Sequence, residues 1–340
     1  MFRTQQDWWI LHAIKVIYET YGVKVSVDAK NKDLLKYGES LQVQTTSTTL
    51  MTLPTGTYNE TYVNRNLITH ISSSSANDTG VIKIEGHTVG DDLSVSSLTQ
   101  AAGVATCTTS VAHNLSNDEW VNVEGANETE YNGIVQVTVT GASTFTYTVD
   151  SGATSPATGT IITNSQNKTF VVQEKTLQGQ TKIALDTPLA RSSRTFVPSQ
   201  NRATNTEGDI YVYEDDTVAS GVPDTDSKVH LIQPANRNQS EKASTSLSSE
   251  DFWIVQSYHA HIFTKQSSFA NVILQKREVG GVFRGLDNIA VSSNTPTVPQ
   301  SFLPYEIIAA NSDVRLIGLA DVDNRNVGGS IDGVLAKVIG

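Results

Sequence analysis

The chain has 340 residues, of which 38% are hydrophobic and only 17% charged, and its formal net charge is -11. This length can bury a sizeable core and suggests two or three domains. A surface of negative sign repels phosphate backbones, which argues against nucleic acid as a direct partner. Polar uncharged residues and glycine take the place of charges, and β-branched threonine favours strands over helices. We therefore expect a mainly β protein with one helix.

The single cysteine, Cys107, excludes an intramolecular disulfide framework and fits assembly in a reducing cytoplasm. It lies in a strand pattern, VATCTTSV, where we expect an inert small hydrophobic residue. The first apolar run is interrupted by Asp7, Lys15 and Glu19 and is followed by no small-residue cleavage site, so we expect no signal peptide. No stretch approaches the ~20 apolar residues that span a bilayer, so we expect no membrane partner.

Residues 1–22 contain the only convincing helix, over Thr4–Tyr21, with Gly22 as a stop signal. Apolar residues recur at the i, i+3, i+4, i+7 spacing of one helix face, and aromatic residues broaden that face. Two interpretations stay open: the helix packs on its own domain, or it is a hydrophobic plug that enters a neighbouring subunit. The candidate interaction residues are Trp8, Trp9, Ile10, Ile14, Ile17, Tyr18 and Tyr21.

Residues 23–60 form short alternating pieces around Val25 and Val27, separated by the charged stretch AKNKD. They contain too few large apolar residues to make a core of their own. The segment is either an extended arm that gains order by lying along other chains or an ordinary pair of edge strands.

Residues 61–100 and 164–340 have the texture of one discontinuous β body. Val81–Gly86 alternates as a half-buried strand does. In Asp251–Phe263, strict alternation places Phe252, Ile254, Gln256, Tyr258, Ala260 and Ile262 on one face and the intervening residues on the other. Both faces are largely apolar, which predicts a central strand, and Ser312–Val338 closes the body. We expect a β-sandwich or jelly-roll-like fold.

Residues 101–163 differ in texture: five short alternating strands are separated by glycine turns, including Tyr131–Gly133. Such spacing is typical of a small β-sandwich or barrel. Insertions fall in exposed loops whose ends lie close together, so we predict an inserted β-module within the discontinuous body.

The motifs of this segment resemble a small β-module that recurs in bacteriophage tail and other virion proteins. They are Gly103–Thr109, His113–Leu115, Val121–Ala126, Tyr131–Gly133, Thr144–Val149 and Ala157–Gly159. The flanking strands, including Gly208–Asp216, are similar to virion-associated proteins of tailed phages. The resemblance implies a structural virion protein of a tailed bacteriophage.

Residues with chemical potential are sparse. His259 and His261 lie on one strand face and could share a metal around a trimer axis, but the surrounding bulky residues favour histidines buried in a core or interface. No nucleophile motif such as G-x-S-x-G occurs. We therefore expect no catalytic residue, no cofactor, no metal and no enzyme activity.

The function expected from these features is that of a head-associated decoration or cement protein, anchored in the virion by its N-terminal helix and arm. Its expected partners are capsid or neck and tail subunits, and copies of itself in a homo-oligomer, with a trimer as the natural guess. The main alternative is a neck, tail or fibre protein that binds the host surface, with the inserted module contacting carbohydrate. An enzyme such as a glycan depolymerase would need paired carboxylates, and no close pair stands out.

Overall fold

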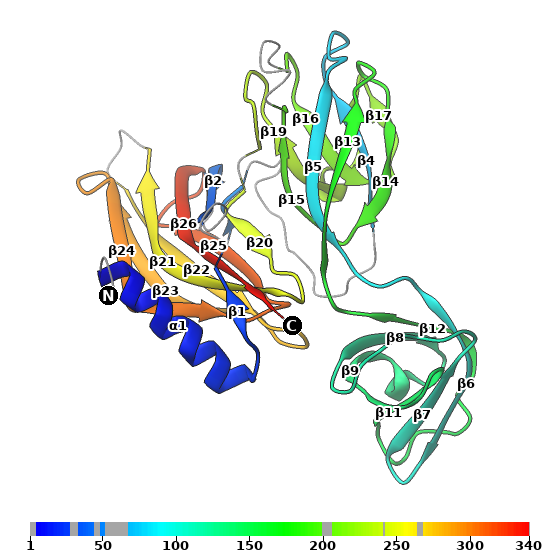
Figure 1. Ribbon diagram of the computed structural model, residues 1–340. Helices are drawn as coiled ribbons and strands as arrows, with labels where there is room; N and C mark the ends of the chain where they lie inside the picture. Colours follow the sequence, from blue (N-terminus) through cyan, green and yellow to red (C-terminus); the bar gives the residue numbers. More distant parts are fainter. Residues whose placement is uncertain are drawn as a thin grey trace.

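The computed structural model describes residues 5–27, 33–43, 48–51, 67–198, 206–240, 242–263 and 268–339. The mainly β prediction is confirmed: these residues form one α-helix and a set of antiparallel sheets. The sheets are arranged in three units that Figure 1 shows as separate bodies. We call them the terminal unit (α1, β1–β3 and β20–β26), the middle unit (β4, β5 and β13–β19) and the barrel unit (β6–β12).

The terminal unit is a sandwich built from both ends of the chain. One five-stranded sheet has the order β1-β26-β21-β24, with β2 also paired to β26, and the other has the order β20-β25-β22-β23, with β3 also paired to β25. The elements are α1 (Gln5–Tyr21), β1 (Val25–Ser26), β2 (Asp33–Val43), β3 (Thr48–Thr49), β20 (Ser244–Ser246), β21 (Asp251–Ile262), β22 (Phe269–Arg277), β23 (Arg284–Ser292), β24 (Thr297–Ile308), β25 (Asp313–Ala320) and β26 (Arg325–Val338).

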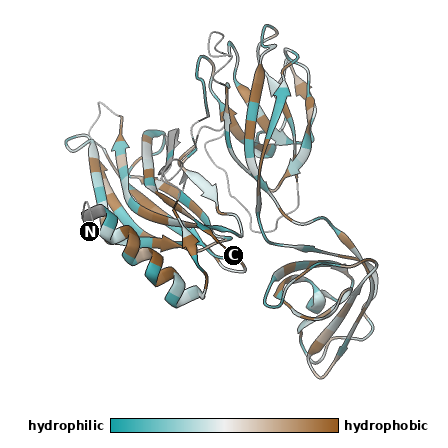
Figure 2. Ribbon diagram, viewed as in Figure 1, coloured by the Kyte–Doolittle hydropathy of each residue, from teal (hydrophilic) through white to brown (hydrophobic). Residues whose placement is uncertain are grey.

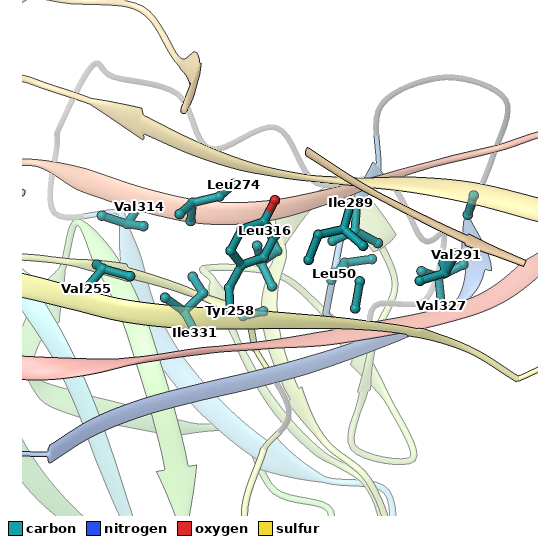
Figure 3. Close-up of a cluster of buried hydrophobic side chains, with 14 of the residues drawn as sticks. Leu50, Val255, Tyr258, Leu274, Ile289, Val291, Val314, Leu316, Val327 and Ile331 are labelled. Atoms are coloured by element: carbon teal, nitrogen blue, oxygen red, sulfur yellow. The ribbon is translucent and has the colours of Figure 1, made fainter. Parts of the chain in front are cut away.

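The core of the terminal unit fills the space between its two sheets. Val255 and Tyr258 of β21 point toward Leu274 and Leu316 of the facing sheet, and Leu50 packs beside them (Figure 3). All five side chains are buried, and burial of each such side chain contributes roughly 1.5–3 kcal/mol. This core is what holds the two ends of the chain together.

The faces predicted for β21 are wrong in one respect. The register shifts between Val255 and Ser257 against both neighbouring strands, which is the signature of a β-bulge at Gln256. Before the bulge Trp253 faces the sandwich core, whereas beyond it Tyr258 does. An extra residue moves every later side chain to the opposite face, so strict alternation fails across it.

The middle unit packs a three-stranded sheet, β13-β5-β15, on a four-stranded sheet, β14-β4-β16-β19, with a β17–β18 hairpin at its side. Its core is separate from that of the terminal unit. The region predicted as one discontinuous body therefore contains two separate sandwiches, each with its own core. The strands are β4 (Ile68–Ser73), β5 (Val81–Thr88), β13 (Thr169–Thr176), β14 (Ile183–Leu189), β15 (Arg191–Phe196), β16 (Ile210–Glu214), β17 (Val218–Ala219), β18 (Val222–Pro223) and β19 (Val229–Gln233), with a 3-10 turn, η3, at Asp226–Lys228.

The barrel unit interrupts a hairpin of the middle unit. Thr88, the last residue of β5, pairs directly with Thr169, the first residue of β13, so both ends of the insertion leave from one place. Its seven strands have the order β10-β11-β7-β6-β12-β8-β9. They are β6 (Leu93–Ala101), β7 (Val104–Thr109), β8 (Trp120–Ala126), β9 (Gly133–Gln136), β10 (Thr138–Gly141), β11 (Thr144–Thr148) and β12 (Gly159–Ser165), with a 3-10 turn, η1, at Thr129–Tyr131.

The outermost strands of this sheet, β9 and β10, are consecutive pieces of chain separated by Val137 alone, so the sheet closes on itself. The inserted unit is also longer at its start than the predicted residues 101–163. Leu93–Ala101 pairs with β7 and β12 and belongs to the barrel. The sequence pattern missed this because the strand alternates in the same way as those of the flanking sheets.

Candidate interaction surface

The helix α1 is locally well specified. Its 17 residues contain neither glycine nor proline. It ends at Gly22, whose φ of 70° lies in the left-handed region and whose N–H donates to the carbonyl of Tyr18 at 3.0 Å. Figure 1 shows the helix lying across one sheet of the terminal unit, and hydrophobic and hydrophilic residues alternate along it in Figure 2.

The inner face of α1 packs on the outer face of that sheet. Ala13 and Ile17 are buried there against Phe252 and Ile254 of β21 and Val334 of β26. The partly buried Ile10 and Ile14 extend the same contact. Three of the seven residues predicted to interact, Ile10, Ile14 and Ile17, therefore hold the helix to its own sheet, as in the first of the two interpretations.

The two adjacent tryptophans point in different directions. The ring of Trp9 lies 6.3 Å from that of Tyr305 on β24, so it joins the helix to the edge of the sheet. The ring of Trp8 stacks on His12 of the same helix, with centroids 5.5 Å apart, and remains 45% exposed. Tyr21 contacts Phe252 at 5.2 Å.

The face of α1 opposite the sheet carries a second apolar stripe. Trp8, Leu11 and Tyr18 are 45%, 46% and 53% exposed. They fall on one side of the helix because they are separated by three and seven residues. We call these three residues the outer stripe. Leu11 was not among the predicted residues, although its spacing from Trp8 and Tyr18 was the signal that could have found it.

The outer stripe is interrupted only by a weakly held charge. Lys15, which falls within the same side of the helix, lies 3.5 Å from Glu19, and both side chains are well exposed. Such surface pairs contribute little to stability. A solvated helix face normally carries polar residues, so the outer stripe is a candidate contact surface.

The described parts of the predicted arm are strands of this chain. β1 and β2 pair with β26, and β3 pairs with β25. They correspond to the edge-strand interpretation, while the remainder of residues 23–60, including 52–60, lies outside the described residues.

His259 and His261 lie on the face of β21 turned away from the sandwich core. The ring of His261 lies over Gly328, where an added Cβ would be 2.2 Å from its Nε2 atom. The centroids of the His261 and Phe263 rings are 4.5 Å apart. The Nδ1 atom of His259 is 3.4 Å from the hydroxyl of Ser330. Both rings pack across the neighbouring strand, and no group of three metal-binding side chains occurs among the described residues.

Cys107 is fully buried in the core of the barrel unit. Burial raises the pKa of its thiol to about 12, so the reactive thiolate does not form at neutral pH. No helix within the described part of the chain has the length and hydrophobicity to cross a bilayer.

A buried ionic cluster, which the sequence analysis did not predict, lies between the middle and terminal units. Asp313, the first residue of β25, is fully buried and accepts hydrogen bonds from Ser246 at 2.5 Å and from Arg277 Nε at 3.0 Å. Lys168 Nζ lies 3.3 Å and Arg191 Nη2 3.8 Å from its carboxylate. Although burial opposes the charge, these three cations hold the pKa of Asp313 well below its usual range.

Comparisons with known proteins give little further information. No protein-family model and no curated protein matches the chain. Two structures from infectious bursal disease virus align weakly. The alignment with the VP2 subviral particle has 10% sequence identity and a TM-score of 0.15, and it covers 96% of this chain and 77% of the VP2 chain. The alignment with the Gt strain structure has 8% sequence identity and a TM-score of 0.14, and it covers 96% of this chain and 83% of the viral chain. At these scores neither alignment indicates a shared fold.

Proposed function

We propose that this protein is a structural subunit of a virus particle that docks on neighbouring particle proteins through the outer stripe of α1. The observation that carries the proposal is that α1 has two apolar faces in different environments. One face is buried on the sheet of the terminal unit, while the opposite face presents Trp8, Leu11 and Tyr18 to solvent. A helix that needed only its own domain would have a polar outer face.

Because α1 is packed on its own sheet, its binding to a partner costs less conformational entropy. Ile17 is completely buried, so the backbone of α1 is already ordered before any partner arrives. Pre-organisation lowers the entropy cost of association, and tryptophan and tyrosine are the residue types that contribute most at interface centres. A short stripe of three such side chains gives a modest contact that many copies multiply across a particle.

A structural role also agrees with the chemistry of the buried charges. The fully buried carboxylate of Asp313 is enclosed by Lys168, Arg191 and Arg277. A general acid or base needs a carboxyl group that can exchange protons with a substrate, which this enclosed carboxylate cannot do. The buried ions join two β units instead.

The setting within this proposal is a tailed phage, from the motifs between Gly103 and Gly159, and the position is the head surface as a decoration or cement protein. A homotrimer is the oligomer we propose for the free protein. The alternative position is the neck, tail or fibre. Copy number in a cryo-EM map of the particle separates the two, because hundreds of copies indicate the head and a few copies indicate the tail.

The docking test uses particles that lack the protein, mixed with the purified chain. We expect the triple variant Trp8→Ser, Leu11→Ser, Tyr18→Ser to lose at least about tenfold in particle affinity, because truncating interface anchors costs more than about 1 kcal/mol each. Co-sedimentation measures the binding, and circular dichroism checks that the fold is retained.

The matched control is Glu19→Ser, Thr20→Ser, which changes two exposed residues of the same helix that lie outside the outer stripe. It should bind as the wild type does. Wild-type affinity of a correctly folded triple variant would exclude the outer stripe as the docking surface.

A further inference from the structure

The outer surface of the barrel unit carries a ladder of threonines across four adjacent strands. Thr99 on β6 pairs with Thr106 on β7, which pairs with Thr146 on β11, which pairs with Thr138 on β10. Adjacent strands are ~4.8 Å apart, so the ladder presents hydroxyl groups at that spacing. All four residues are exposed or half-buried.

A second row of hydroxyls runs beside the ladder. Ser97, Thr108 and Thr144 are paired across β6, β7 and β11, two residues along each strand from the ladder. Two residues of strand span roughly 7 Å, so the two rows form a grid. None of the seven side chains is charged, in a protein whose net charge is -11. The grid is therefore a polar, neutral surface.

A groove of about 510 Å³ opens at the β10 end of the ladder, lined among others by Thr138, Thr146 and Thr148. It lies where the chain passes from β9 to β10, at the seam of the barrel. Gln136 and Asp118 line its other wall, and the side-chain amide of Gln136 donates to the carbonyl of Asp118 at 3.0 Å. This bond fixes the Gln136 side chain at the groove.

The polar groups of the groove can both donate and accept hydrogen bonds. The hydroxyls of Thr138 and Thr148 have no hydrogen-bond partner in the part of the chain that the structure describes, and that of Thr146 makes one long contact, 3.4 Å, with the carbonyl of Thr138. The carboxylate of Asp118 is an acceptor. Val104, 47% exposed, adds an apolar patch to the same groove.

This combination selects one class of ligand. Hydroxyls and an amide complement a polyhydroxylated molecule, and a small apolar patch complements the C–H face of a sugar ring. The described residues that line the groove include no lysine, arginine or histidine, and Asp118 repels anions. We propose that the groove and the adjoining threonine ladder bind a neutral glycan, which gives the barrel unit a recognition role separate from the docking of α1.

The site lies on rigid strands, so binding requires little ordering of the protein. The one aromatic residue among the described residues that line the groove, Tyr147, is buried and donates its hydroxyl to the carbonyl of Tyr131, so it offers no exposed ring for stacking and each copy binds weakly. Repetition of the chain on a particle would raise the apparent affinity by avidity, because the second contact becomes intramolecular. The intrinsic site is nevertheless a property of the single chain, and it can be tested without a particle.

The test applies the purified full chain to an array of neutral and acidic oligosaccharides, followed by calorimetric titration with the best neutral ligand. Thr138→Val, Thr146→Val removes two hydroxyls while keeping β-branched side chains that suit a strand. We expect this variant to bind about tenfold more weakly, since two hydrogen bonds are lost. The control, Thr160→Val, Thr176→Val, changes two exposed threonines on β12 and β13 and should bind as the wild type does.

Each other outcome would overturn the inference. They are the absence of binding to any neutral glycan, binding confined to acidic glycans, and equal affinity of the two valine variants. Circular dichroism and the thermal midpoint of each variant establish that a loss of binding does not come from a loss of fold. Failure of this test would leave the docking proposal for α1 untouched, because that proposal uses neither the groove nor the ladder.

Discussion

The terminal unit contacts the middle unit and the barrel unit in two opposite ways. Its contact with the middle unit is a buried ionic cluster, in which Asp313 of the terminal unit meets Lys168 and Arg191. One contact with the barrel unit is apolar, because the ring of Trp120 on β8 lies against Gly280, where an added Cβ would be 2.9 Å from the ring. The ionic contact is fully enclosed, whereas the apolar contact is made by a ring that is only half-buried.

The difference between these two contacts indicates which units keep a fixed position relative to each other. Separating the middle unit from the terminal unit would leave buried charges without their partners. The cluster therefore strongly fixes the position of one unit relative to the other. Lys168, just before β13, also donates through Nζ to the carbonyl of Asn311 at 2.8 Å, which ties the chain leaving the barrel to the terminal unit. Lifting Trp120 from Gly280 costs only a local apolar contact. We therefore expect a firm two-unit base with a more readily displaced barrel unit.

The largest expected effect is at the ionic cluster. Asp313→Asn keeps the side-chain shape but leaves Lys168, Arg191 and Arg277 without their shared anion. We expect the free energy of unfolding to fall by about 3–5 kcal/mol, as when one partner of a buried pair is removed. Urea denaturation measures the change.

Asp186→Asn is the matched control, because Asp186 pairs with Lys175 while its side chain is 70% exposed. It should cost less than about 1 kcal/mol. Equal effects of the two substitutions would contradict the distinction between the buried junction and an ordinary surface pair.

The next effect is a pH dependence at the same junction. His87 is buried in the middle unit, and burial, followed by the nearby Lys168, lowers its pKa to about 3. Above pH ~6.5 the imidazole is neutral in both the folded and the unfolded state, so its titration does not lower the free energy of unfolding there. Between pH ~6.5 and 3 only the unfolded state binds the proton, and stability falls as the pH falls, by about 2 kcal/mol at pH 5.

His87→Gln removes this titration. The difference in unfolding free energy between pH 7 and pH 5 should therefore be smaller in the variant, as measured by urea denaturation at both values. The wild type, measured at the same two pH values, is the reference. An unchanged pH dependence in His87→Gln would show that His87 does not stay neutral in the folded state.

The smallest effect on stability is expected at the barrel contact. Trp120→Ala removes the ring that lies against Gly280, and we expect a loss of about 1 kcal/mol or less because the position is only half-buried. Small-angle X-ray scattering should nevertheless show a broader distribution of distances as the barrel unit moves away. Trp8→Ala, a tryptophan substitution remote from the barrel, should leave the scattering unchanged. If the scattering profile of Trp120→Ala also stayed the same, the contact with Gly280 would not be needed to hold the barrel unit in place. The segments between β5 and β6 and between β12 and β13 would then be sufficient.

The sequence by itself determined the features that depend on neighbouring residues. The 3.6-residue period and Gly22 specified α1, and period-two alternation specified the strands and the mainly β class. The threonine ladder was visible as T-x-T patterns in Val104–Thr109 and Thr144–Thr148, but which strands lie side by side could not be deduced from them. The outer stripe was half predicted: the helix was found, but which of its two apolar faces remains exposed depends on the sheet beneath it.

Only the tertiary structure decided the bulge at Gln256, the division of the body into two sandwiches and the ionic cluster. A bulge is a property of a strand ladder and leaves no local signal. The cluster joins Lys168, Arg191, Arg277 and Asp313, whose sequence separations carry no information about proximity. In a mainly β chain most stabilising contacts are non-local, so long-range pairing sets both the position of buried charge and the face that α1 leaves to solvent.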